Sequence, residues 1–88
     1  MARDSKPPQK ARLLEAVDRA LAGDWQAAHA IVQKHEDDAV AAWIHAVVHR
    51  MEGDLDNAGY WYRRCRRALS GDVSTKAELE EIRAKLSD

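Results

Sequence analysis

Two histidines four residues apart, His45 and His49, are the residues of this sequence best suited to chemistry. On an α-helix this spacing puts both imidazoles on one face, which is the arrangement of the histidine pair in helical zinc sites. The residues between them are Ala-Val-Val, so the glutamate that accompanies such a pair in zinc proteases is missing. Four other residues have side chains that could supply a third ligand: His29, His35, Asp54 and Cys65.

The sequence brings none of these third ligands beside the pair, and no metal or other cofactor is therefore expected. We predict instead that His45 and His49 pack against the following helix and hydrogen-bond Asn57, Tyr62 or backbone atoms. A metal-dependent enzyme that uses His45 and His49 is the alternative.

The single cysteine, Cys65, does not indicate a nucleophile. It lies on the apolar arc of its predicted helix, and a buried thiol has a raised pKa and reacts slowly. No Ser/His/Asp arrangement and no glycine-rich phosphate loop occur in the sequence. We therefore expect a protein without catalytic activity.

Basic and aromatic residues gather on the opposite side of the same predicted helix: Tyr60, Arg63, Arg64 and Arg67. Arginines near the end of a helix interact favourably with the helix dipole, which is one explanation of this face. A second explanation is functional: the guanidinium groups bind a carboxylate or phosphate of a partner, and Tyr60 stacks on the same partner. This face is the candidate anion-binding or partner-binding site.

The elements that carry these residues are all helical. Apolar residues recur at helical spacing and predict five helices and no strand. They form one antiparallel hairpin over residues 9–35, a second over residues 38–69 and a last helix over residues 74–87. Each hairpin turns at a Gly-Asp pair, at residues 23–24 and 53–54, because glycine suits the left-handed end of one helix and aspartate caps the next.

The expected architecture is all-α, with two stacked hairpins and a C-terminal capping helix. The fourth helix is expected to bury one arc: Leu55, Ala58, Trp61, Tyr62, Cys65 and Leu69. Trp43 is expected to be buried beneath the last helix. Residues 9–88 form a single domain, and residues 1–8 are predicted to be a mobile tail because they offer little apolar surface.

Two segments of the chain resemble the tetratricopeptide repeat. GDLDNAGYWYRRC, at residues 53–65, carries the clearer match, and GDWQAAHAIV, at residues 23–32, a partial one. The resemblance implies antiparallel helix pairs that bind a peptide or partner protein on a concave surface. The matching glycines, Gly23 and Gly53, are 30 residues apart, whereas the family repeat has about 34 residues. The segment HAVVHRMEGDLDNAGYWYRR is also similar to a core of small helical proteins of unassigned function, which implies no activity.

Composition limits the partners. The net charge of −1 gives no overall attraction to nucleic acid or to an anionic membrane, so such a partner would need a local basic patch. We expect no secretory signal, because the charged, proline-interrupted first residues have no apolar core. The sequence has no apolar run of membrane-spanning length, and its lone cysteine is typical of a reducing cytoplasm. We expect a cytoplasmic protein-interaction or self-association module, whose occupant is a protein, a peptide or a second copy of the chain. The alternative is anion, phosphate or nucleic-acid binding through the face formed by Tyr60, Arg63, Arg64 and Arg67.

Overall fold

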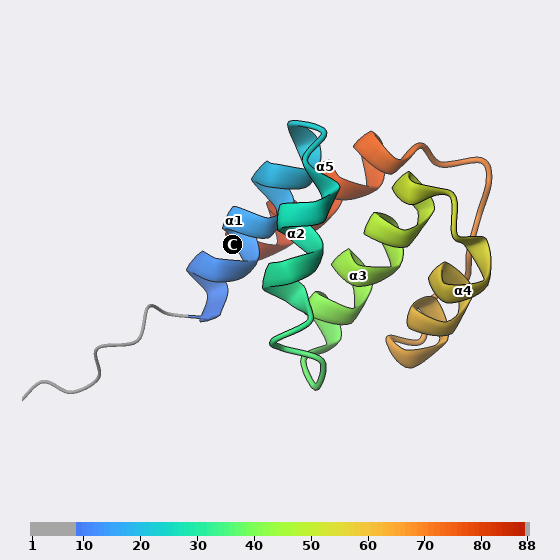
Figure 1. Ribbon diagram of the computed structural model, residues 1–88, viewed down its shortest axis with the longest axis horizontal. Coiled ribbons are helices and arrows are strands. Elements are labelled where there is room, and N and C mark those ends of the chain that lie inside the picture. Colours follow the sequence, from blue (N-terminus) through green and yellow to red (C-terminus); the bar gives the residue numbers. More distant parts are fainter. Residues whose placement is uncertain (1–8, 88) are drawn as a thin grey trace, which may run out of the picture.

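The structure, a computed structural model, describes residues 9–87 and consists there of five helices joined by turns and loops (Figure 1). The helices are α1 (Gln9–Leu21), α2 (Trp25–Val32), α3 (Ala39–Glu52), α4 (Leu55–Arg64) and α5 (Thr75–Ser87). Within the described range there is no strand, which confirms the predicted all-α class. The predicted tail at residues 1–8 and the final residue, Asp88, lie outside the described residues. Over residues 9–87 no helix is long and apolar enough to cross a lipid bilayer.

The two Gly-Asp pairs have the same local structure. Gly23 and Gly53 are left-handed, with φ of +89° and +86°, a conformation that strains residues with a Cβ atom. The carboxylate of the following aspartate accepts a hydrogen bond of 3.2 Å from the backbone N–H three residues later, at Ala27 and at Asn57. Each pair therefore ends one helix and caps the next, which produces the hairpins α1–α2 and α3–α4.

Helix α3 is the centre of the structure. It packs against all four other helices, and Figure 1 shows it between α2 and α4. Because it is covered on every side, its residues 41–49 are all buried, including two histidines. A helix that is apolar or small nearly all round suits this central position.

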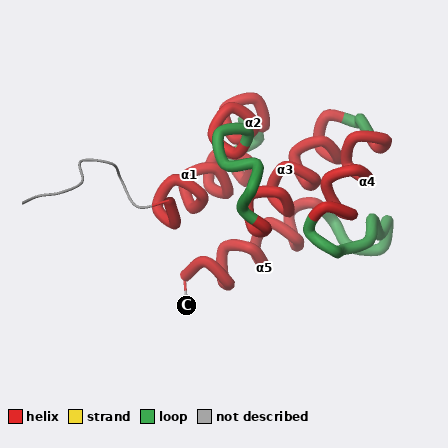
Figure 2. Tube along the Cα trace, turned by 90° about the horizontal axis from the view of Figure 1, so that it is seen from below, coloured by secondary structure: helices red, strands yellow, loops and turns green. Residues whose placement is uncertain are grey.

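Helix α5 covers the face formed by α1 and α3. It packs against these two helices (Figure 2) and buries Leu79, Ile82 and Leu86. Trp43 is only 2% exposed, and its Nε1 donates a hydrogen bond of 2.6 Å to Glu78 of α5. The prediction that the last helix buries Trp43 is confirmed.

The predicted extent of the fourth helix is wrong. Helix α4 ends at Arg64, because Arg66 is left-handed (φ +63°) and the Arg67 N–H donates back to the Tyr62 carbonyl at 2.8 Å. This turn brings the Arg67 guanidinium 3.3 Å from the centroid of the Trp43 ring, a contact that a continued helix would lose. Leu69 is consequently 41% exposed instead of lying on a buried arc.

Leu55 also departs from the prediction, since it is 56% exposed in the first turn of α4. Helical spacing assigned it to the buried arc with Ala58, Trp61 and Tyr62, which are indeed buried. Helix α4 packs on α3 alone, so only the narrower stripe that faces α3 is covered. Leu55, in the first turn of α4, and Leu69, in the chain after α4, are thus exposed apolar residues.

The carboxylate of Glu78 joins α5 to both helices of the second hairpin. It accepts hydrogen bonds from Trp43 Nε1 at 2.6 Å, Tyr62 Oη at 2.7 Å and Arg50 Nη1 at 2.8 Å. Arg50 Nη2 also donates to the carbonyl of Val73, in the segment that leads into α5, at 2.7 Å. The side chains of Arg50 and Glu78 are largely buried, and burial raises the pKa of the Tyr62 hydroxyl, which stays protonated as a donor.

Replacing Glu78 should therefore destabilise the fold strongly. Glu78→Ala leaves the buried Arg50 charge and two other donors without their acceptor, and we expect a loss of about 3 kcal/mol in the free energy of unfolding. Glu80→Ala is the matched control, because Glu80 pairs only with the exposed Lys76 and should matter far less. Urea unfolding measures both variants, and equal losses would contradict the central role of Glu78.

The strained backbone at Arg66 gives a second prediction. Glycine adopts φ near +63° without a Cβ penalty, so Arg66→Gly should raise the free energy of unfolding by about 0.5–1 kcal/mol. Arg63→Gly, inside α4, should instead lower it by about 1 kcal/mol. A lower urea midpoint for Arg66→Gly would show that the turn is not strained.

Candidate functional site

The four residues of the predicted anion-binding face do not form one cluster. Tyr60 and Arg64 form one pair, in which Arg64 Nη1 donates to Tyr60 Oη at 3.3 Å. The guanidinium carbon of Arg64 lies 5.9 Å from the Tyr60 ring centroid and 5.2 Å from that of Trp61. Tyr60 is half-exposed at this side of α4.

Arg63 and Arg67 lie in a groove of about 560 Å³ between α4 and the chain that follows it. The exposed side chains of Leu55 and Leu69 line the same groove. Because α4 ends at Arg64, Arg67 reaches this groove from the loop and not from the helix face. The predicted face is thus divided: Arg64 lies beside Tyr60, and Arg63 and Arg67 share a partly apolar groove.

The arginines of this region lack carboxylate partners, although arginines elsewhere have them. Arg50 pairs with Glu78, and Arg83 pairs with Asp18, both at 2.8 Å. Among residues 9–87, no carboxylate oxygen lies within 4.0 Å of the side-chain nitrogens of four residues: Arg63, Arg64, Arg66 and Arg67. Asp56 lines the groove without pairing, so the positive charge there is only partly offset.

A second group of reactive side chains is a histidine cluster, formed by His29 of α2 with His45 and His49 of α3. Helical spacing places His45 and His49 on one face, and the packing of α2 on α3 brings His29 to that face. The ring centroids are 4.7 Å apart for His29 and His45, 5.2 Å for His29 and His49, and 5.0 Å for His45 and His49. One nitrogen from each ring lies within 4.8 Å of the other two.

Polar partners for this cluster are few. His45 is 3% exposed, and its Nε2 faces the Nε2 of His29 at 3.0 Å. The Nδ1 atoms of His45 and His49 are buried and have no hydrogen-bond partner among the described residues. A buried polar atom without a partner costs about 1–3 kcal/mol, so the fold places these imidazoles at some expense in stability.

Burial also keeps His45 uncharged. It lowers the pKa of His45 from 6.5 to about 3, and repulsion from His29 and His49 acts in the same direction. The indole of Trp61 stacks on the His45 ring at 3.9 Å between centroids, with 14° between the planes. His45 is therefore a neutral imidazole at physiological pH. Its ring lies nearly parallel to the Trp61 indole, between α3 and α4.

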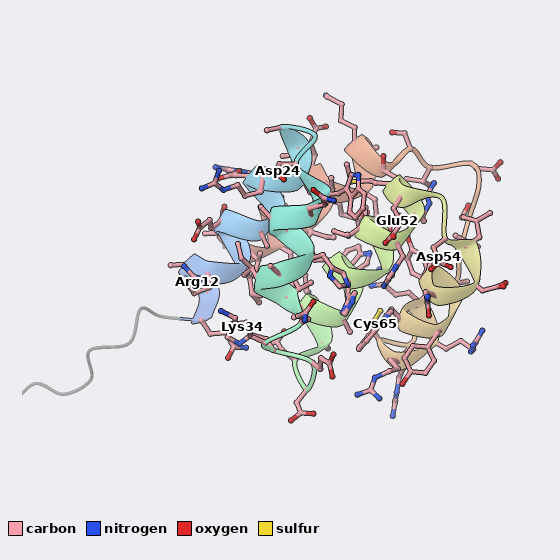
Figure 3. The ribbon with its side chains drawn as sticks, in the orientation of Figure 1. Arg12, Asp24, Lys34, Glu52, Asp54 and Cys65 are labelled. Carbon is pink, nitrogen blue, oxygen red and sulfur yellow. The ribbon has the colours of Figure 1, made fainter. Side chains whose placement is uncertain are left out.

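Two carboxylates lie at the edge of the cluster, and Figure 3 labels both at the connection between α3 and α4. Glu52 Oε1 is 2.9 Å from His49 Nδ1, and Asp54 Oδ2 is 4.0 Å from it. The contact with Glu52 is close but does not have the direction of a hydrogen bond, so it is an electrostatic contact. Asp54 is also the N-cap of α4, where hydrogen bonds from Asn57 lower the pKa of its carboxyl group.

The predicted partners of the two histidines are wrong. The hydroxyl of Tyr62 donates to Glu78, and the side-chain amide of Asn57 donates to Asp54. Neither is hydrogen-bonded to an imidazole among the described residues, although His45 does pack on the following helix, where it stacks on Trp61. The third side chain beside the pair is His29, one of the four candidates by type. No local spacing connects it to α3, because the two lie in different hairpins.

Of the remaining ligand candidates, Asp54 lies at the edge of the cluster, whereas His35 and Cys65 lie elsewhere. His35 follows α2 in the loop to α3 and belongs to no group of facing ligands in the described part of the chain. Cys65 is half-buried at the end of α4, and its thiol donates to the Tyr62 carbonyl at 3.4 Å. Burial raises the pKa of the Cys65 thiol, so the thiol is not activated as a nucleophile.

No protein-family model, curated protein or solved structure matches the chain.

The pKa of His45 predicts how stability depends on pH. In the unfolded chain His45 titrates near 6.5, and in the fold near 3, so between these values the unfolded chain binds more protons. The free energy of unfolding should therefore be constant above pH 6.5 and should fall as the pH is lowered below it. Urea midpoints between about pH 5 and 7, with EDTA present, measure this effect before most carboxyl groups protonate.

The matched variant is His45→Gln, which removes the titrating group and should flatten this part of the pH profile. His35→Gln, outside the cluster, should leave the profile of the original protein unchanged. An identical slope in all three proteins would assign the pH dependence to other groups, among which His29, His49, Glu52 and Asp54 face His45 or its neighbours.

Proposed function

We propose that this protein is a helical interaction module that binds an acidic, leucine-containing segment of a partner protein. The binding surface is the groove between α4 and the loop after it. The observation that carries the proposal is the combination, in this one groove, of two exposed leucines with two guanidinium groups that lack carboxylate partners. The proposal requires neither a catalytic group nor a cofactor.

The apolar part of the groove favours a leucine-containing partner. Leu55 and Leu69 are two of the few large apolar side chains that remain exposed among the described residues. Burying such a side chain contributes about 1.5–3 kcal/mol, and a partner with matching apolar residues would cover both leucines together.

The charged part of the groove favours an acidic partner. Guanidinium groups bind carboxylates through paired hydrogen bonds, and Arg63 and Arg67 are not engaged by carboxylates of this chain. Phosphate presents the same kind of acceptor, but the net charge of −1 and the nearby leucines make a nucleic acid a poorer match.

The tetratricopeptide resemblance supports an interaction role but suggests a different surface. In that family the partner occupies the concave side, which would correspond here to the face of α1 and α3. Helix α5 of this chain already covers that face. A partner would therefore bind to the outer side of α4, which no other helix covers because α4 packs only on α3. The free cysteine fits a reducing compartment, and we infer a cytoplasmic setting for the interaction.

Fluorescence anisotropy with short labelled peptides tests the proposal. A peptide with alternating glutamates and leucines should bind, and its affinity should fall as salt rises. Replacing its glutamates by lysines or its leucines by serines should weaken binding. Arg63→Glu should reduce the affinity of the protein for the acidic peptide by about tenfold or more, since charge reversal adds repulsion.

Lys34→Glu is the matched control, because it makes the same charge change on an exposed side chain. Figure 3 shows Lys34 on the α2 side of the molecule, away from Cys65 and α4. Equal binding of the glutamate and lysine peptides, or full binding by Arg63→Glu, would reject the groove. Preferential binding of a short single-stranded oligonucleotide would favour a phosphate ligand, and concentration-dependent dimers in sedimentation would identify a second copy as the occupant.

A further inference from the structure

We propose that His29, His45 and His49 together bind a divalent transition-metal ion of the zinc type, with a fourth coordination position on the side of half-buried His29. This site is separate from the α4 groove and does not depend on the function proposed for that groove. It rests on the convergence of three imidazoles from two helices in a region where the protein supplies few other polar partners.

The geometry is close to that of a three-histidine metal site. In tetrahedral zinc sites the Zn–N distance is 2.0–2.1 Å, so two ligand nitrogens lie roughly 3.3 Å apart. Here the Nε2 atoms of His29 and His45 are 3.0 Å apart, and one nitrogen of each ring lies within 4.8 Å of the others. Side-chain rotations that move a ring nitrogen by about 1.5 Å would close the set around one ion.

The chemistry of the donors selects the ion. Imidazole nitrogen suits Zn²⁺, Cu²⁺, Ni²⁺ and Co²⁺, whereas Mg²⁺ and Ca²⁺ prefer oxygen ligands. Metal ligands must be unprotonated, a condition that imidazole ordinarily meets above its unperturbed pKa of about 6.5. Three protein ligands leave one tetrahedral position for water or another small ligand, which is the pattern of zinc sites that are not purely structural.

The surroundings would orient the ligands. The carboxylate of Glu52 lies beside Nδ1 of His49, which leaves Nε2 as the nitrogen that can point to a metal. Carboxylates commonly accept a hydrogen bond from the second nitrogen of a metal-bound histidine, and the Glu52 contact would take on this role once its direction adjusts on metal binding. Trp61 stacks on His45 and fixes the plane of its ring. All three histidines lie on helices, which hold their backbones more rigidly than loops would.

A competing site shares His49. The side chains of His49, Glu52 and Asp54 also lie within 4.8 Å of one another. Glu52 is exposed, and carboxylates grouped near a helix start are common without any ion, as Asp54 already serves as the N-cap of α4. In the three-histidine set the Nε2 atoms of His29 and His45 already face each other at 3.0 Å, and we therefore assign the ion to that set.

Metal titration of the full chain tests the assignment. After removal of metal with a chelator, the protein is titrated with Zn²⁺ in competition with a chromophoric chelator, and Co²⁺ absorption reports the coordination number. We expect one tetrahedral ion per chain. His29→Gln, which changes the most exposed ligand, should lower the Zn²⁺ affinity at least about tenfold, whereas the control His35→Gln should leave it unchanged.

Variants of Glu52 and Asp54 distinguish the three-histidine site from the competing site of His49, Glu52 and Asp54. If the ion lies among the three histidines, Glu52→Gln should lower the affinity by roughly tenfold as a positioning residue, and Asp54→Asn, which keeps the N-cap, should have little effect. Loss of binding in Asp54→Asn together with full binding by His29→Gln would overturn the assignment. Arg63→Glu should not alter Zn²⁺ binding, so failure of this proposal and failure of the groove proposal are distinguishable.

Measurements on the original protein avoid dependence on whether a variant folds. In NMR spectra, addition of one equivalent of Zn²⁺ should shift the ring signals of His29, His45 and His49 but not those of His35. Absence of Zn²⁺ binding, or shifts at His35 alone, would overturn the proposal and leave the cluster as packed imidazoles without a metal.

Discussion

The carboxylate of Glu78 fixes the position of α5 relative to the second hairpin. The position of α5 in turn decides which faces of the other helices are covered. Glu78 accepts hydrogen bonds from Trp43 and Arg50 of α3 and from Tyr62 of α4. In a largely buried setting, three donors can share this acceptor only if the helices keep one relative placement. With α5 held there, the face of α1 and α3 is closed, and the outer side of α4 remains the uncovered part of the second hairpin.

Helix α4 separates the two candidate sites. Its buried residue Trp61 stacks on His45 and belongs to the histidine cluster, while Arg63 and Leu55 face the groove on the outside. Tyr62 lines the inner wall of the groove, and its hydroxyl donates to Glu78. A 10-residue helix thus offers different chemistry on different sides. Because the groove is open and carries arginines without carboxylate partners while His45 and His49 are buried, the two sites differ in chemistry, and so do the ligands proposed for them.

The end of α4 illustrates how long-range contacts override local preference. Helical spacing continues to Leu69, yet the chain turns at Arg66 in a conformation that most residues avoid. The turn lets Arg67 stack on Trp43, which lies in the preceding helix and is itself hydrogen-bonded to Glu78. The strain of one residue is offset by this stacking and by the Arg67 N–H bond to the Tyr62 carbonyl. The groove exists because of this turn, since Arg67 and Leu69 reach it only from a chain that has left the helix.

The sequence alone determined the features that arise from interactions within a few residues. It predicted five helices, the Gly-Asp turns, the shared face of His45 and His49 and the burial of Trp43. Helical periodicity and capping are local, so they can be read from neighbouring residues. The tertiary structure decided that His29 joins the histidine pair, across 16 residues to His45, and that Glu78 binds Trp43 across 35 residues. It also ended α4 at Arg64 and divided the predicted arginine face. These features depend on which helix faces which, and that choice follows from the packing of the whole core and not from the spacing within any one helix.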